Sequence, residues 1–408
     1  MKNTLVSIVC FFVLLITACQ SNTDSSSRDV EAKAIIKVNT INTTTPLLGK
    51  LGWKLKEQPL LVIGSKEGEL HDQFYRAYGA ITLENGTFVA TNSETSEIRF
   101  YSPDGTFRKS IGQQGQGPGD FAEFSNMRLY KLSKNEFVVN DPGNDRFQIY
   151  NNDGEHLKVH TMPKIEGAGN PSMNNVLSNG SWLIWSTEGS AVLRGNDGDI
   201  IEKKYLLHLF DPNFNYDKVL HRFTARKKYV NTLKGITHYP YIPLTAQPSH
   251  TTGTKAGVLF ATGVNPVISR FDTSGQLTDQ YKWEASRIKT EDIWERYKDE
   301  FYLATLEGRR KEQYAHFLKQ DLPIPEYTPV ISELKVDEDG NIWAERFQLP
   351  WHEHTTWDVL NADGEWLTTI QVPDHLRMTE IGSDYVLGFS TKNGFTQLVS
   401  YPIVKNSK

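Results

Sequence analysis

Short apolar runs separated by turn residues recur along most of the chain. In the first clear unit, Phe88–Ala90 follows an Asn-Gly turn, and Ile98 and Phe100 alternate with polar residues before an Asp-Gly turn. Asn-Gly and Asp-Gly pairs accept the positive φ angles that tight hairpin turns require. The pattern therefore predicts four short antiparallel strands over residues 81–111.

This unit returns at a fixed offset of 49 residues. Aligning Phe88 with Phe137 superposes the two Asp-Gly turns, and the same offset aligns Ile98–Tyr101 with Phe147–Tyr150. Weaker copies centre on Trp182–Trp185, Val258–Phe260, Ile342–Trp343 and Tyr385–Leu387. Four antiparallel strands per repeat are typical of a propeller blade. The chain is therefore predicted to be all-β, a six-bladed β-propeller with four-stranded antiparallel blades.

One apolar strand lies outside the six repeats. Leu60–Ile63 precedes the first unit and has no partner of its own. We expect it to complete the last blade, because that pairing closes the ring and removes an open sheet edge. The propeller is predicted to cover residues 55–405 as a single domain. A β-sandwich is the alternative, since it also shows short strands with turn signals, but it does not account for a four-strand period.

Two segments interrupt the repeats. Residues 226–255 are rich in Thr, Pro, His and Tyr and are predicted to form a long insertion loop. Residues 290–320 have apolar positions on one helical face, so a helical insertion is predicted there. Thr290 is expected to cap its start, and Gly308 is expected to break it. Insertions on one face of a repeat fold often shape its binding surface.

The N-terminal residues have the pattern of an export signal. Lys2 precedes the apolar run Leu5–Thr17, which is shorter than the about 20 residues that a membrane-spanning helix needs. The run ends in Leu-Ile-Thr-Ala-Cys, which resembles the lipobox of bacterial lipoproteins. By that resemblance residues 1–18 are a signal peptide and Cys19 carries the lipid that anchors the mature protein to the membrane. A transmembrane anchor is the alternative.

Residues 19–54 are predicted to be a flexible tether, because they begin with a polar, Ser-rich stretch. The expected location is the cell envelope, on the periplasmic face of the outer membrane. Cys10 leaves with the signal and Cys19 is lipidated, so no disulfide is expected within one mature chain.

The charge balance argues against a nucleic-acid partner. The formal net charge is −5, and no long basic run is present, whereas nucleic-acid binding relies on clustered Lys and Arg. The nearest cluster is Arg226–Lys228, which is interpreted as a solvated loop.

Two motifs resemble those of a known family. Ile111–Phe121 contains Gly-Gln-Gly-Pro-Gly-Asp-Phe and resembles the signature of six-bladed β-propeller lipoproteins of Bacteroidetes, which are related in fold to NHL-repeat and TolB-like propellers. Pro329–Trp343 is similar to a motif in a late blade of that family. The resemblance implies the fold and the location but almost no chemistry. The Gly-rich loop lacks the Gly-Lys-Ser/Thr ending of a phosphate-binding loop, so its glycines are expected to allow tight backbone passage.

Candidate ligand-binding residues lie in the 226–255 insertion and in the extra residues between the second and third predicted strands of blade five. They are Arg346, Trp351, His352, His354, Tyr239 and Tyr241. Aromatic and guanidinium side chains are typical of binding sites, but they also pack over blade ends. The two histidines flank Glu353, and their spacing would place both rings on one side of an extended chain. Zinc takes three or four ligands, so surface or hydrogen-bonded histidines are the favoured interpretation.

A divalent-cation site is the alternative at the ends of two predicted strands. Propeller hydrolases resembling gluconolactonases bind a cation near the central channel, and Asn92 and Asp141 occupy broadly comparable positions. Calcium takes six or more oxygen ligands, and few candidates are visible. Asn and Asp also cap turns at such places.

The sequence favours binding over catalysis without excluding an enzyme. No Gly-x-Ser-x-Gly elbow occurs, and no paired-carboxylate spacing stands out. We therefore expect a non-catalytic binding or scaffold module for an envelope protein, peptide or glycan, without a cofactor. The alternative is a metal-dependent hydrolase or lyase of the lactonase-like type, with calcium or zinc.

Overall fold

The computed structural model describes residues 39–43, 51–253 and 257–405. Cys19, the predicted signal peptide and the tether up to residue 38 lie outside the described residues. Within these ranges no helix is long and apolar enough to cross a membrane.

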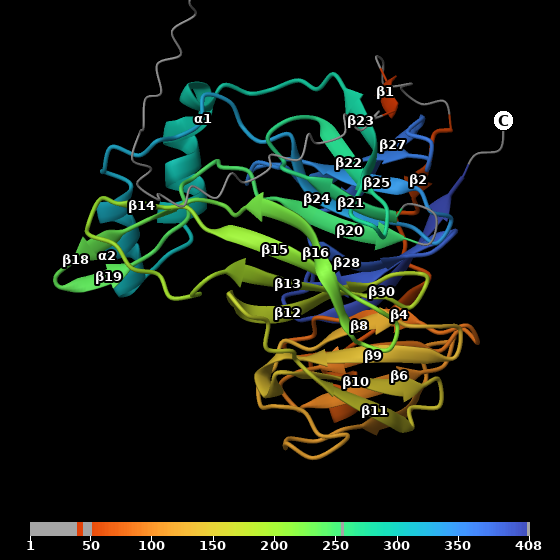
Figure 1. Ribbon diagram of the computed structural model, residues 1–408. Helices are drawn as coiled ribbons and strands as arrows, with labels where there is room; N and C mark the ends of the chain where they lie inside the picture. Colours follow the sequence, from red (N-terminus) through yellow and green to blue (C-terminus); the bar gives the residue numbers. More distant parts are fainter. Residues whose placement is uncertain (1–38, 44–50, 254–256, 406–408) are drawn as a thin grey trace, which may run out of the picture. The chain divides into compact units, whose positions relative to one another are not determined.

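Six antiparallel sheets form the blades of the propeller (Figure 1). Blade one contains β4 (Ala80–Thr82), β5 (Phe88–Asn92), β6 (Glu97–Tyr101) and β7 (Phe107–Ile111). Blade two contains β8 (Arg128–Lys131), β9 (Glu136–Asp141), β10 (Arg146–Asn151) and β11 (His156–Thr161). Blade three contains β12 (Ala168–Val176), β13 (Trp182–Glu188), β15 (Lys204–Phe210) and β16 (Tyr216–Thr224).

The second half of the propeller repeats this order. Blade four contains β20 (Ser249–Gly253), β21 (Gly257–Ala261), β22 (Val267–Phe271) and β23 (Leu277–Trp283). Blade five contains β24 (Ile331–Val336), β25 (Ile342–Arg346), β26 (His354–Leu360) and β27 (Trp366–Pro373). Blade six contains β28 (Leu376–Ile381), β29 (Tyr385–Ser390) and β30 (Gln397–Val404) from the C-terminal part of the chain. The predicted six-bladed β-propeller is confirmed.

Residues that are equivalent in the sequence repeat also have equivalent pairing partners in blades one and two. Phe88 pairs with Tyr101 in blade one, and Phe137 pairs with Tyr150 in blade two. An irregularity in the pairing of the third and fourth strands falls before Tyr101 in one blade and before Tyr150 in the other. A shared hydrophobic pattern therefore fixes the same register twice, because a slip by one residue would turn every buried side chain outward.

The core is divided among the spaces between neighbouring blades. Between blades one and two, for example, Val89 and Phe100 pack with Phe137 and Tyr150. Each neighbouring pair of blades has such a cluster of buried side chains. Apolar burial is worth roughly 25 cal/mol per Å², so the blades are held mainly by their contacts with each other.

Blade six is completed by residues from the N-terminal part of the chain. β3 (Leu61–Ile63) pairs with β30, with Leu61 opposite Ser400. The short strand β2 (Lys54–Leu55) pairs with the far end of β30. The expectation that Leu60–Ile63 closes the ring is confirmed.

A further strand lies within the segment predicted to be a tether. β1 (Asn39–Thr43) pairs in parallel with β23 and becomes a fifth strand of blade four. This part of the N-terminal segment is therefore a strand of the propeller rather than a free linker.

The connections between strands fall into two sets at opposite ends of the blades, because the strands of each blade alternate in direction. Connections from first to second and from third to fourth strands are short turns, and we call this the turn end. The other connections include all the long segments, namely 64–79, 112–127, 189–203, 225–248, 284–330 and 347–353. We call this the insertion end, which carries the helices at the left of Figure 1.

The helical insertion is confirmed, with different details at its ends. α1 (Thr290–Tyr297) continues into the π-helical segment η3 (Lys298–Leu303), and α2 (Gly308–Phe317) follows. The predicted N-cap is wrong, because the Thr290 hydroxyl donates to the carbonyls of Pro325 and Glu326 instead of to the helix amides. Gly308 begins α2, and its φ of 52° suits glycine.

The segment 226–255 is more regular than predicted. It contains β17 (Lys228–Tyr229), β18 (Asn231–Leu233) and β19 (Ile236–His238), and it ends in β20. β17 pairs with β14 (Ile200–Ile201) of the preceding insertion. The Thr-rich strand β20 belongs to blade four, and its weak apolar pattern hid it in the sequence. Two single turns of 3₁₀ helix, η1 (Leu70–Asp72) and η2 (Pro142–Asn144), complete the described elements.

Candidate functional site

Three of the insertions pack into one hydrophobic unit, which we call the insertion cluster. Its buried members are Tyr229, Ile242, Leu244, Tyr297, Tyr302, Phe317, Leu318 and Leu349. The rings of Tyr229 and Phe317 lie 5.6 Å apart, and the His316 and Asn231 side chains are hydrogen-bonded at 2.9 Å. Side chains from 225–248, 284–330 and 347–353 therefore form a shared core beyond the ends of the blades.

Two of the predicted ligand-binding residues belong to the packing of this unit. Trp351 packs against the insertion cluster, and the guanidinium of Arg296 lies 4.0 Å from its ring centre. His352 Nδ1 faces the backbone amide of Leu349 at 3.4 Å. His352 thus meets a partner in its own loop, as a hydrogen-bonded histidine would.

The remaining candidates lie in different surroundings. Arg346 holds Asp358 through two donors, with its Nη2 2.7 Å from Asp358 Oδ1. His354 begins β26 and is exposed, and Tyr239 is partly buried. Tyr241 lines a pocket beside blade three, so the structure does not bring the six candidates together at one site.

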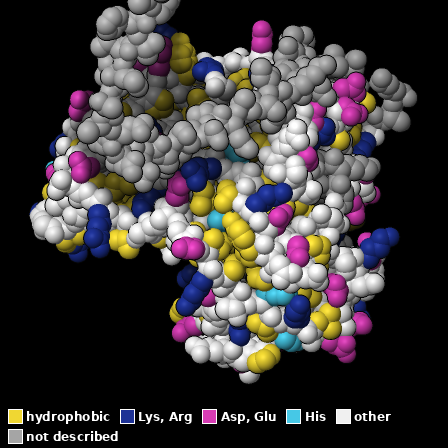
Figure 2. Space-filling view, in the orientation of Figure 1, with side chains coloured by type: hydrophobic (Ala, Val, Ile, Leu, Met, Phe, Trp, Pro, Cys, Tyr) yellow, Lys and Arg dark blue, Asp and Glu magenta, His cyan; other side chains and the backbone are white. Residues whose placement is uncertain are grey.

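We call this hollow the Tyr241 pocket, and its volume is about 130 Å³. Its walls are Asn170, Trp185, Thr187, Ala191, Leu193, Ile201, Lys203, Tyr205, Ala225, Arg226, Lys228 and Tyr241. They come from the insertion end of blade three and from the two insertions that β14 and β17 join. Basic and hydrophobic side chains lie next to one another over β15 and β16 (Figure 2).

Aromatic rings and cations alternate around the pocket. The rings of Trp185 and Tyr205 lie 5.1 Å apart. The Arg226 guanidinium and the Lys228 ammonium lie 5.0 and 4.7 Å from the centre of the Tyr241 ring, within cation–π range. Burial raises the pKa of Tyr205, so its hydroxyl stays protonated and can donate.

The pocket lining carries positive charge without a compensating acid. Lys203, Arg226 and Lys228 line it, and none of its described lining residues is Asp or Glu. Lys227, between two of them, is exposed and forms an ion pair with Glu202 at 3.0 Å. In the segment Arg226–Lys228, which was interpreted as a solvated loop, Lys227 is exposed, whereas Arg226 and Lys228 are partly buried and line the pocket. Successive side chains of an extended segment point to opposite sides, and this alternation could have distinguished Arg226 and Lys228 from Lys227 in the sequence.

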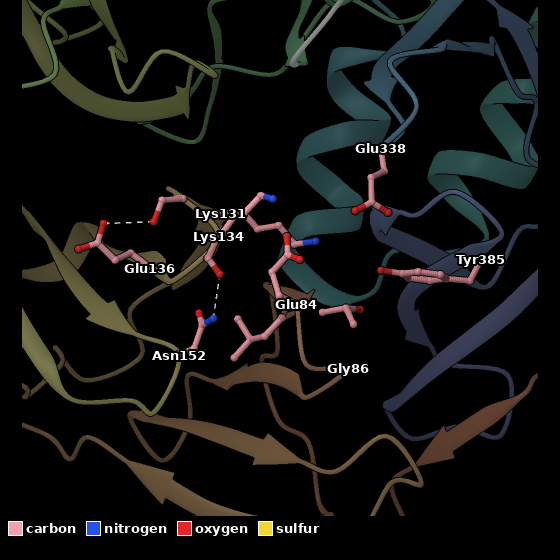
Figure 3. A pocket seen from close by; sticks show the side chains of 11 residues that line it. Glu84, Gly86, Lys131, Lys134, Glu136, Asn152, Glu338 and Tyr385 are labelled. Carbon is pink, nitrogen blue, oxygen red and sulfur yellow. Dashed lines mark hydrogen bonds between the residues drawn. The ribbon is translucent and has the colours of Figure 1, made fainter.

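A second pocket, of about 230 Å³, lies at the turn end (Figure 3). Turns of blades one, two and five and the start of β29 supply its walls, whose charged side chains are Glu84, Glu136, Glu338, Lys131 and Lys134. The view shows Glu338 and Tyr385 across from Glu84 and the two lysines. Mixed charges of this kind partly neutralise each other.

Glu380 contacts two polar side chains of the turn-end pocket, those of Lys131 and Tyr385. Lys131 forms an ion pair with Glu380 at 3.2 Å, and the Tyr385 hydroxyl donates to the same carboxylate. Burial, with Glu380 beside it, raises the pKa of Tyr385 far above its ordinary value. Two polar side chains of this pocket, those of Lys131 and Tyr385, therefore share Glu380 as a partner.

The two metal candidates occupy equivalent positions at the ends of β5 and β9, and both are fully buried. Asn92 accepts a hydrogen bond from the Tyr75 amide at 2.7 Å and donates to Thr95 at 2.8 Å. Asp141 accepts from Asn144 at 2.8 Å and from the Ala122 amide at 3.3 Å. Within the described ranges no three His, Cys, Asp or Glu side chains form a group that could hold a metal ion.

The Gly-rich loop is held by side chains of blade two. Arg146 donates to the carbonyls of Gln116, Gly117 and Asp120 at 2.6–2.9 Å. Gln148 accepts from the Gly119 amide and donates to the Asp120 carbonyl. The loop therefore has a structural role, as expected from its motif.

Sequence reasoning missed a few titratable groups. Burial raises the pKa of Glu345 to about 7, Glu333 adds to this shift and Lys335 opposes it. A lone Glu in an apolar strand gave no pattern to detect. Ser186 and His208 form a hydrogen-bonded pair at 2.8 Å, but both are buried within blade three. Glu345, in contrast, is only partly buried.

No protein-family model matches the chain, and no curated protein matches it. Several solved structures are similar. A member of the DUF4221 family from Bacteroides vulgatus has a TM-score of 0.51 and 13% identity, over 87% of this chain and 99% of that chain. A protein described as exported from Bacteroides fragilis has a TM-score of 0.47 and 14% identity, over 91% and 100%.

A gluconolactonase from Xanthomonas campestris has a TM-score of 0.42 and 12% identity, over 86% of this chain and 100% of that chain. The structural neighbours thus include two Bacteroides proteins, one of them described as exported, and a gluconolactonase. At these identities the likeness to the DUF4221 member shows the propeller fold alone.

Proposed function

We propose that the protein is a non-catalytic binding module of the cell envelope, which holds a protein, peptide or glycan partner at its insertion end. The observation that carries this proposal is the placement of every long insertion at one end of the blades, three of them around one buried cluster. Loops placed on a rigid scaffold are where repeat proteins concentrate binding.

The surface of this end has the character of a binding site. Tyr241 and Phe301 are each 44% exposed although they are large and apolar. Aromatic residues are enriched at the centres of interfaces. The opposite end has short turns and a pocket whose lining mixes acidic and basic side chains, so it is the weaker candidate.

The proposal includes anchoring through a lipid on Cys19, at the periplasmic face of the outer membrane. Its support is the lipobox-like sequence, because Cys19 lies outside the described residues. A tethered module meets partners in the same membrane layer at a raised effective concentration. No nucleic acid is proposed as a partner, in keeping with the net charge of −5.

The metal-dependent lactonase-like alternative has less support in the geometry. Its two candidate ligands, Asn92 and Asp141, have side chains engaged in local hydrogen bonds. A cation would have to displace these partners and find further oxygen ligands.

Site-specific crosslinking in intact cells tests the binding proposal. A photoreactive amino acid at Phe301 samples the insertion end, and the same probe at Leu157 on β11, which is 49% exposed, is the matched control. We expect a discrete crosslinked product from position 301 and none from position 157. Equal labelling from both positions, or none from either, contradicts the proposal. Divalent metal that survives dialysis at one ion per chain would instead support the alternative.

A further inference from the structure

We propose that the Tyr241 pocket binds an anionic sugar residue, with a carboxylate or a sulfate as its charged group. This inference rests on the proposed function, because it names the ligand class for part of the same end. It requires cations without an acidic partner, flat apolar surfaces beside them and room for a single ring.

The cations of the pocket are held in place without being neutralised. The guanidinium of Arg226 donates through Nε to Thr245 at 2.9 Å and through Nη2 to the Ile242 carbonyl at 3.2 Å. In the part of the chain that the structure describes, neither Arg226 nor Lys228 forms an ion pair, whereas Lys227 between them does. Hydrogen bonds to charged groups are about twice as strong as neutral ones, so an anion entering this pocket gains a strong partner.

The aromatic walls of the pocket suit the sugar ring of such a ligand. Trp185, Tyr205 and Tyr241 combine apolar ring surfaces with polar edges. The C–H groups of a sugar ring can cover such surfaces, while its hydroxyls reach polar side chains at the rim. Asn170, which is exposed, and the Tyr205 hydroxyl are available for such hydrogen bonds.

The size of the pocket favours a sugar over larger anions. Sites for drug-sized ligands usually measure about 300–1,000 Å³, and this hollow measures about 130 Å³. A nucleotide needs space for a base, a sugar and a phosphate, and an extended peptide needs an open strand edge. One terminal sugar residue fits the volume and the charge together.

Isothermal titration calorimetry on the full chain in detergent tests this assignment. The probes are trigalacturonate, its uncharged methyl ester, and a sulfated galactose trimer. We expect at least one charged probe to bind, and the methyl ester to bind roughly tenfold more weakly or worse than trigalacturonate. If only the sulfated trimer binds, the anion is a sulfate and the assignment stands.

Variants that replace a cation with neutral glutamine test whether the charged probes bind in the Tyr241 pocket. Arg226→Gln and Lys228→Gln should each weaken the charged probe roughly tenfold, while Lys227→Gln, on the paired residue outside the pocket, should leave it unchanged. Thermal unfolding of each variant confirms that it is folded. Tyr241→Leu should also weaken binding and provides a readout that does not alter charge.

Three results would overturn the inference. They are no binding of either charged trimer, equal binding of the methyl ester and trigalacturonate, and tighter binding of a nucleotide or of a peptide carboxylate. Crosslinking from Phe301 is independent of these probes. A discrete crosslinked partner together with no sugar binding would therefore overturn this inference and leave the proposed function in place.

Discussion

At the scale of single residues, two glycines of the Gly-rich loop differ in what surrounds them. Gly112 has a φ of 90°, and a Cβ atom built there would lie 2.5 Å from the buried ring of Phe121. Gly119 has a similar φ of 84°, but a Cβ atom there would meet nothing within 4 Å. Substituting alanine at Gly119 adds backbone strain alone, whereas the same change at Gly112 adds backbone strain and a steric overlap with Phe121.

We predict that Gly112→Ala lowers the free energy of unfolding by about 2–4 kcal/mol, because it adds overpacking to the strain of a left-handed backbone. Gly119→Ala should cost only about 1 kcal/mol, from the backbone alone. Urea unfolding of both variants measures the difference. Equal losses would show that Phe121 moves aside freely and that the loop is not tightly packed.

A second prediction at this scale concerns pH. The pKa of Glu345 is raised from 4.5 to about 7, so between these values the unfolded chain has lost a proton that the folded protein keeps. The free energy of unfolding should therefore fall as pH rises through this window and level off above it.

In Glu345→Gln this contribution is absent, so the fall should be smaller. Urea unfolding of both proteins at about pH 5 and about pH 7.5 provides the test. An identical fall in the variant would mean that other groups cause it.

Residue roles were harder to predict than strands. Asn92 and Asp141 were correctly placed at strand ends, yet their hydrogen-bond partners come from loops whose path the sequence does not reveal. The Tyr241 pocket joins residues from 170 to 241 that share no period. Periodicity reports which face of a strand is buried, but not which insertions meet one another.

At the scale of elements, β3 is the strand on which ring closure depends. Ile63 is 4% exposed and lies in the core between blades six and one, while its neighbour Val62 is 50% exposed. Both residues pair with β30. The blades themselves were predictable because turns and apolar strands repeat, whereas β20 and β1 were missed because they lack apolar alternation.

We predict that Ile63→Ala lowers the free energy of unfolding by about 2–5 kcal/mol, since it leaves a cavity in a closed core. Val62→Ala removes an exposed side chain from the same strand and should change stability by less than about 0.5 kcal/mol. Chemical denaturation of the two variants distinguishes them. A small effect at Ile63 would imply that β3 contributes little to closure.

At the scale of the whole propeller, the ring depends on residues from both ends of the described chain. A chain that begins at Leu51 lacks β1, so blade four becomes a four-stranded sheet like those of blades one, two, three and five, but it keeps β2 and β3. A chain that begins at Gly64 also lacks β2 and β3 and leaves an edge of β30 unpaired. Unpaired strand edges promote association between molecules.

We therefore predict that the chain beginning at Leu51 stays monomeric, while the chain beginning at Gly64 associates or precipitates and unfolds at a lower temperature. Light scattering coupled to size exclusion, together with thermal unfolding, measures both effects. A monomeric Gly64 chain of unchanged stability would rule out a closing role for β3.

The pairing of β3 with β30 also orders events while the protein is made. β3 is synthesised early and β30 is among the last strands to be synthesised. The two strands therefore pair only after almost the whole chain has been made. Blades one to five can form from local hairpins, whereas the most distant contact is expected to form slowly and last. Resistance to proteases should therefore rise only after β30 has emerged from the ribosome, because the fold is complete only when this strand pairs with β3.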